Sequence, residues 1–208
     1  MMRPDPGPRP WGVPSEDPRH PWAPTEQPLP VAPWLEERLF DKRIVMLNGP
    51  LDASAATRTA AALMALDAAS MDEIRLQMST PDGELAGAFA LVDAMDMLRA
   101  PVHAVVTSRV GGAAIAVLAA ADRRLAYRHA LLRICEPPGN RLVGTADEVA
   151  AAAGAYLRAV EELAIRIAEV TRRPRSRVED DLSAGRVLTA TEAMEYGLID
   201  EVIGKPGT

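Results

Sequence analysis

The sequence predicts an α/β domain preceded by a proline-rich arm. From residue 34 onward, short apolar segments typical of strands alternate with longer segments of helical periodicity. Glycine, proline or asparagine separates several of these segments, as expected for turns. Because a strand, a helix and a second parallel strand form a right-handed crossover, this order favours a sheet covered by helices. The 208 residues are enough for one domain with a buried core.

The arm comprises residues 1–33, which carry 11 of the 18 prolines and show no hydrophobic period. Proline fixes its own φ and removes a backbone donor, so neither helix nor sheet can propagate here. We expect this segment to be disordered or polyproline-like. Trp11 and Trp22 are unusual in such an arm, and two readings stay open: incidental exposure, or docking on a neighbouring surface.

The first half of the domain, 34–208, begins with a short expected helix at 34–40. A buried strand at 43–51 closes in an Asn-Gly-Pro turn. An alanine-rich helix is expected at 55–70. A strand is expected at 73–79, where apolar and polar residues alternate.

The middle of the domain continues the alternation. The turn 80–83 leads into an expected helix at 84–99. A strand at 102–108 and a helix of small residues at 111–121 follow.

In the last part of the domain, the sequence predicts two short strands, a long helix and three short elements. The long helix has an apolar stripe that suits either the core or a subunit contact. The expected strands are 124–127, 130–137 and 198–203, and the expected helices are 145–172, 174–183 and 188–197.

Composition and charge exclude several classes of protein. A formal net charge of −6 argues against a nucleic-acid binder, because phosphates require a basic surface. One cysteine excludes an intrachain disulfide framework, and three histidines show no metal-ligand spacing. We find neither a membrane-spanning run nor a signal-peptide core, so we expect a cytoplasmic protein. We also expect no metal and no cofactor.

Chemistry is expected where a strand feeds a turn and then a helix, because free backbone N–H groups there can hold a developing negative charge. Two segments qualify, 78–87 and 106–116. Neither matches a phosphate-binding loop pattern. At the second turn, where acyl transfer would need a nucleophile, the chain offers only Gly111 and Gly112.

Three segments resemble the ClpP family, the proteolytic subunits of the Clp protease. The most specific is T-A-x-E-A-x-E-Y-G-L-I-D at 189–200, and the segments 40–52 and 79–95 add to it. The resemblance covers roughly residues 34–204. It implies a ClpP/crotonase-like spiral of ββα units with a long handle helix. It also implies a Ser-His-Asp triad inside a chamber of two stacked seven-membered rings.

The positions that match the family's triad carry other residues in this chain. The serine position is Gly112, the histidine position is Cys135 and the aspartate position is Gly185. Glycine has no side chain to attack a carbonyl, and a thiol does not replace an imidazole as base. The resemblance therefore implies a non-catalytic subunit.

Two alternatives stay open. One is an active endopeptidase with a relocated nucleophile, for which Ser108 or Cys135 would serve; His103 and His129 do not lie at the family's base position. The other is a crotonase-like acyl-CoA binder, because that superfamily uses backbone N–H groups and needs no serine. We expect Cys135 to be a packed apolar residue.

Further positions depart from the family. The turn that resembles its oxyanion hole comprises Asp82, Gly83 and Ala113, and Asp82 would bring a carboxylate toward an oxyanion site. Pro138 removes a donor from the strand that would bind a substrate peptide. We expect the carboxylates of 179–181 to form a solvated helix face.

The resemblance implies partners of two kinds. One is the chain itself or active ClpP paralogues, in a ring where this subunit has a structural or regulatory role. The other is an AAA+ Clp unfoldase, which binds an aromatic-lined pocket in the family. The matching positions here are Arg75 and Gln77, so docking through this subunit should be impaired. No nucleic acid or membrane partner is expected.

Overall fold

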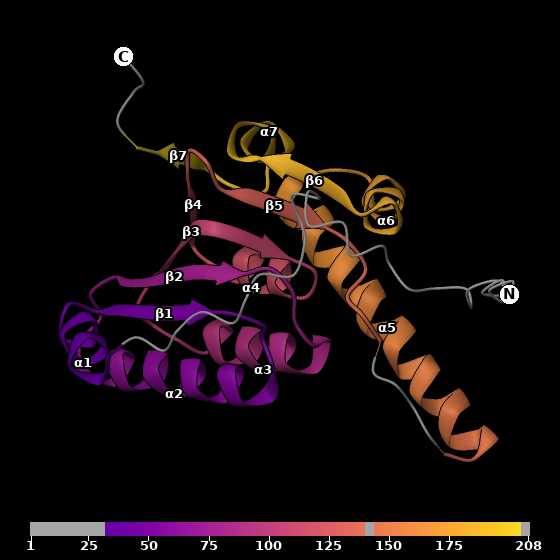
Figure 1. Ribbon diagram of the computed structural model, residues 1–208, viewed down its shortest axis with the longest axis horizontal. Helices are drawn as coiled ribbons and strands as arrows, with labels where there is room; N and C mark the ends of the chain where they lie inside the picture. The colour runs from indigo at the N-terminus through magenta and orange to yellow at the C-terminus, as the bar shows by residue number, and fades with distance from the viewer. Residues whose placement is uncertain (1–31, 140–143, 205–208) are drawn as a thin grey trace, which may run out of the picture.

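The computed structural model describes residues 32–139 and 144–204. Seven helices and seven strands lie along this part of the chain, and they alternate except where two strands, and then two helices, follow one another (Figure 1). The helices are α1 Pro33–Asp41, α2 Ala53–Ala69, α3 Leu85–Asp96, α4 Ala114–Ala120, α5 Ala146–Thr171, α6 Arg175–Ala184 and α7 Ala190–Tyr196. The strands are β1 Ile44–Asn48, β2 Ile74–Thr80, β3 Val102–Gly111, β4 Arg123–Tyr127, β5 Leu131–Ile134, β6 Arg186–Thr189 and β7 Glu201–Ile203. The predicted α/β class is confirmed.

The sheet is mostly parallel and branches at β3. Strands run in the order β1-β2-β3-β4-β7, all parallel. The first half of β3 pairs with β4, whereas Arg109, Val110 and Gly111 pair with β5. Strand β6 pairs antiparallel with β5. The branch brings the end of β3 beside β5, and it is there that the candidate site forms.

Several expected boundaries are wrong. The strands expected at 43–51, 130–137 and 198–203 are shorter, spanning Ile44–Asn48, Leu131–Ile134 and Glu201–Ile203. Residues 188 and 189 were expected in a helix but lie in β6, which pairs with β5 and precedes α7. Gly111 ends β3, and the helix expected from residue 111 begins at Ala114. The proline-rich arm is outside the described residues, apart from Ala32 and Pro33 at the start of α1.

The core lies between the sheet and the helices that cover it. The alternation predicted for 73–79 is confirmed, because Ile74, Leu76 and Met78 are fully buried. Helices α2 and α3 lie side by side against the sheet (Figure 1). The side chain of Asp52 caps α2 by accepting a hydrogen bond of 2.7 Å from the Ala55 N–H.

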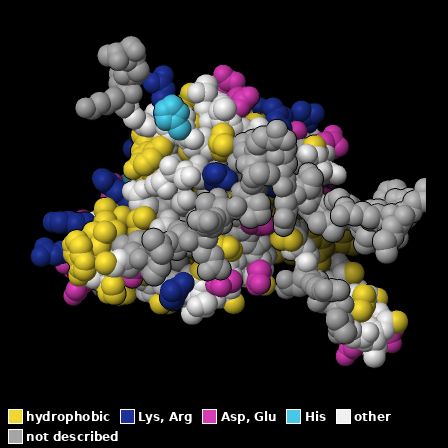
Figure 2. All heavy atoms as spheres, in the orientation of Figure 1, with side chains coloured by type: hydrophobic (Ala, Val, Ile, Leu, Met, Phe, Trp, Pro, Cys, Tyr) yellow, Lys and Arg dark blue, Asp and Glu magenta, His cyan; other side chains and the backbone are white. Residues whose placement is uncertain are grey.

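Helix α5 divides into a packed half and a projecting half. Its buried residues, Leu163, Ala164 and Ile167, all lie in the second half. The first half extends away from the body (Figure 1), and its end carries hydrophobic and acidic side chains on the surface (Figure 2). Among the described residues, no helix combines the length and apolar character that crossing a membrane requires.

Candidate functional site

Gly112 lies in the sharp turn between β3 and α4. Its φ is +54°, a left-handed conformation that glycine adopts without steric cost. Its N–H donates a hydrogen bond of 3.3 Å to the carbonyl of Arg133 on β5. The turn is therefore held against the neighbouring strand, and residue 112 faces the space between β3, β5 and the β2–α3 turn.

Cys135 follows β5 directly and faces the same space. Its side chain is buried, as expected for a packed apolar residue. Burial raises the pKa of the thiol, and this effect exceeds the opposite effects of the Arg133 charge and of a hydrogen bond from the Gly112 backbone. The group is therefore a neutral thiol near neutral pH, which is a poor nucleophile and not a base.

Gly185 ends α6 at a φ of +67° and completes the convergence. A Cβ at this position would lie 3.8 Å from the Cβ of Cys135 and 3.3 Å from Nη2 of Arg133. The fold thus brings together Gly112, Cys135 and Gly185, which are far apart in the sequence. None of the three supplies a hydroxyl, an imidazole or a carboxylate.

The β2–α3 turn faces the same space through Asp82. Oδ1 of Asp82 accepts a hydrogen bond of 2.8 Å from the Gly83 N–H. Burial raises the pKa of this carboxyl group, although the Gly83 N–H and the Arg133 charge act in the opposite direction. Ala113, the third residue of the expected turn, is fully buried before α4.

The residues considered as substitutes lie in other surroundings. Ser108 is exposed on β3. His103, on the same strand, places Nδ1 3.4 Å from Oε2 of Glu73. His129 is exposed in the turn between β4 and β5. These residues do not form a nucleophile–base pair with one another.

The carboxylates of 179–181 divide into two exposed residues and one buried residue, which corrects the expectation of a solvated face. Glu179 and Asp180 are exposed, whereas Asp181 is 5% exposed. Asp181 accepts hydrogen bonds of 2.8 Å from the Tyr196 hydroxyl and 3.2 Å from Nη1 of Arg186. The buried carboxylate therefore joins α6, β6 and α7. No cluster of three potential metal ligands occurs among the described residues.

Arg133 is a site residue that the sequence analysis missed. Its guanidinium lies against Gly185, and its charge opposes the burial that raises the pKa of both Asp82 and Cys135. The signal was present, because side chains alternate along a strand and Arg133 therefore shares a face with Cys135. Its presence makes the site a mixture of opposite charges around a buried thiol.

The segment after β5 is fixed on both sides. The Glu136 N–H donates a hydrogen bond of 3.1 Å to the carbonyl of Leu182 on α6. The hydroxyl of Tyr156 on α5 donates one of 2.7 Å to the carbonyl of Pro137. Backbone groups that an added peptide strand would use are thus already engaged at these two residues.

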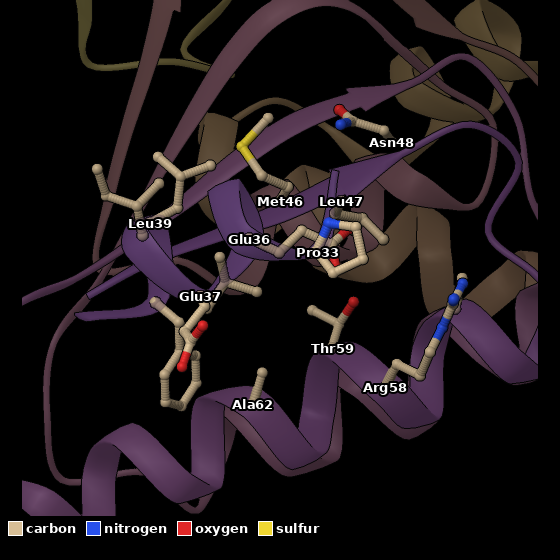
Figure 3. Close-up of a pocket in the computed structure, with 14 residues that line it drawn as sticks. Pro33, Glu36, Glu37, Leu39, Met46, Leu47, Asn48, Arg58, Thr59 and Ala62 are labelled. Atoms are coloured by element: carbon tan, nitrogen blue, oxygen red, sulfur yellow. The ribbon is translucent and has the colours of Figure 1, made fainter. Parts of the chain in front are cut away.

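A separate groove of about 610 Å³ lies between α1, β1 and α2 (Figure 3). Glu36 and Glu37 of α1 line one side, and Arg58 and Thr59 of α2 line the other. The expected docking positions lie one strand further into the sheet. Gln77 is partly buried beside Met46, and Arg75 is exposed and pairs with Glu73 at 2.9 Å.

Comparison with known proteins shows which family the chain resembles. The family model described as Clp protease matches residues 33–206. The ATP-dependent Clp protease proteolytic subunit of Streptococcus pneumoniae is 33% identical over 170 residues, which cover 80% of this chain and 87% of that protein. Proteolytic subunit 2 of Streptomyces coelicolor is 28% identical over 80% of this chain and 78% of its own length. Proteolytic subunit 4 of Streptomyces avermitilis is 27% identical over 80% and 75%. The chain therefore belongs to the Clp protease family.

Proposed function

We propose that this chain is a non-catalytic subunit of a Clp-type protease assembly in the cytoplasm. One observation carries the proposal: the fold brings Gly112, Cys135 and Gly185 together, where the family resemblance implies a Ser-His-Asp triad. Peptide hydrolysis by this mechanism needs a nucleophile and a base within hydrogen-bonding reach. Two glycines and a buried neutral thiol supply neither.

The proposed role is structural or regulatory, in a ring formed with copies of this chain or with active paralogues. Helix α5 supports a role in assembly, because it extends beyond its own domain and Leu157 is 66% exposed near the point where it leaves the body. Large exposed apolar side chains in such a position suit a subunit contact. An AAA+ unfoldase would meet Arg75 and Gln77 rather than aromatic side chains, so this subunit would contribute little to docking.

Peptide hydrolysis by the purified full chain tests the proposal. We expect no turnover of a fluorogenic peptide or of casein above the buffer rate, and the same result for Ser108→Ala and Cys135→Ala. An active Clp proteolytic subunit serves as the positive control. Turnover by the wild type that either substitution abolishes would establish a relocated nucleophile and overturn the proposal.

Mixing with an active paralogue tests the regulatory role. We expect mixed particles whose peptidase activity per particle falls in proportion to the fraction of this chain they contain. Particles that form only from one kind of subunit would exclude a role within mixed rings.

A further inference from the structure

The Asp82 turn has a fixed backbone. The Leu51 N–H donates a hydrogen bond of 3.0 Å to the Asp82 carbonyl, and the Glu84 N–H donates one of 2.8 Å to the Leu51 carbonyl. A Cβ at Gly83 would lie 2.6 Å from the Cβ of Leu51, so only glycine fits this close approach. Because the backbone is held on both sides, the only conformational freedom that Asp82 keeps is rotation of its side chain.

One oxygen of that side chain fills two places that matter for chemistry. Oδ1 of Asp82 accepts the Gly83 N–H at 2.8 Å. The same oxygen lies 2.6 Å from the position that a Cβ on residue 112 would occupy. The first place is where the family resemblance puts an oxyanion, and the second is where it puts the nucleophile's side chain.

The charges in the site are consistent with this placement. The negative charge of Asp82 contributes to the raised pKa of Cys135, so the carboxylate and the thiol share one environment. The Arg133 guanidinium acts on both groups from the side of Gly185. A carboxylate that faced solvent from an exposed turn would have little effect on a buried thiol, because water would screen it.

We infer that Asp82 is an internal blocking group: its carboxylate takes the backbone donor of the oxyanion turn and the space beside Gly112, and so closes the site to a substrate carbonyl. This inference deepens the proposed function and rests on it. It adds a barrier that is independent of the missing triad. Restoring the triad residues alone would leave a negative charge where negative charge must develop during hydrolysis.

Cys135 offers a direct probe, because it is the only cysteine in the chain. The rate at which iodoacetamide alkylates it reports both the thiolate fraction and access to the site. Asp82→Gly should raise this rate several-fold, and Asp82→Asn, which keeps the shape but not the charge, should raise it less. Glu84→Gln, two residues away on an exposed side chain, is the matched control and should change nothing.

Equal alkylation rates in the wild type, Asp82→Asn and Asp82→Gly would show that the carboxylate does not face the site, and would overturn the inference. That result is distinct from failure of the proposed function, which would appear as peptide turnover by the wild type. The two proposals therefore fail in different assays.

Reconstruction of the triad measures the consequence for hydrolysis. Gly112→Ser would displace the Asp82 carboxylate, since Oδ1 of Asp82 is the mobile end of a side chain, but would leave the carboxylate in the turn. In a variant with Gly112→Ser, Cys135→His and Gly185→Asp, adding Asp82→Gly should raise kcat by about 10²-fold, the usual effect of one oxyanion donor. An active triple variant that gains nothing from Asp82→Gly would contradict the inference.

Discussion

Gly112 combines an unusual backbone conformation with a position in the candidate site. Its φ of +54° suits glycine, and a Cβ there would meet Oδ1 of Asp82 at 2.6 Å. An L-residue in the left-handed region costs about 1–2 kcal/mol. We therefore expect Gly112→Ala to lower the free energy of unfolding by about that amount, measured by denaturant titration.

The matched control is Gly154→Ala on α5. Gly154 lies in a regular helix, where its added Cβ would meet only Nη1 of Arg158, at 3.4 Å. Alanine in a helix is favoured over glycine by about 1 kcal/mol, so this variant should be neutral or stabilised. If Gly112→Ala proved as stable as the control, the turn would not require a left-handed residue.

Tyr196 makes stability depend on pH in the alkaline range. Burial and the hydrogen bond to Asp181 raise the pKa of its phenol to about 12. The folded state therefore keeps this proton more tightly than the unfolded state, whose pKa is near 10. The resulting stabilisation is complete below about pH 10 and is lost as the pH rises toward about 12.

Thermal unfolding between pH 9 and pH 11 checks this prediction. Tm of the wild type should fall over this interval, and Tyr196→Phe should show a smaller fall from a lower starting value. Tyr127→Phe, at a residue that is 44% exposed, is the control and should follow the wild type. Parallel curves for the wild type and Tyr196→Phe would mean that this phenol does not titrate differently on folding.

The sequence allows the backbone positions of the site to be predicted, but not its side-chain contacts. Gly112, Cys135 and Gly185 could be located because segments of family resemblance flank them, and the fold brings the three together. The roles of Asp181 and Arg133 were missed. Arg133 could have been found from its alternation with Cys135 along the strand. Asp181 could not, because it turns inward toward Tyr196, a partner on another element that no local pattern records.

At the scale of elements, two helices begin with the same cap but differ in how they pack. Thr189 and Glu192 exchange hydrogen bonds at the start of α7, and Thr145 and Glu148 do so at the start of α5. Ala190, Ala193 and Tyr196 bury α7 in the core. The first half of α5 has no buried residue. Loss of the cap should therefore act globally in α7 and locally in α5.

We expect Thr189→Ala to lower the free energy of unfolding by about 1 kcal/mol, the usual value of such a cap. Thr145→Ala should leave global unfolding unchanged and speed hydrogen exchange only in the first turns of α5. Denaturant titration and hydrogen exchange on both variants measure the contrast. A global loss in Thr145→Ala would show that the projecting half of α5 is coupled to the core.

The elements that sequence periodicity predicted best are those with long apolar patterns. Strand β2 shows the expected alternation, and α5 the expected length. Strand β6 was missed because four residues are too few to show a period and its partner, β5, is more than fifty residues earlier in the chain. Pairing between strands, rather than local propensity, determines such an element.

At the scale of the whole molecule, the domain has one projecting element, the first half of α5. A helix of 26 residues keeps its three buried residues in one half and leaves Leu157 and Val149 exposed in the other. An isolated domain gains nothing from this arrangement, since exposed apolar area is unfavourable in water. A second subunit against the projecting half would remove that cost, and so the exposed stripe should matter for assembly but not for folding.

Leu157→Glu should therefore reduce the assembled mass without changing the unfolding of the domain. Seven subunits of 22.3 kDa would weigh about 156 kDa, and two stacked rings twice as much. We expect native mass spectrometry of the wild type to give one of these masses, or a mixed ring when an active paralogue is present. The Leu157→Glu variant should fall to the next smaller species, because a buried carboxylate without a partner opposes the contact.

The control is Ala155→Glu, because Ala155 is exposed two residues away on the opposite side of the helix; this variant should assemble like the wild type. If Leu157→Glu assembled like the wild type, the projecting half of α5 would not be a subunit contact.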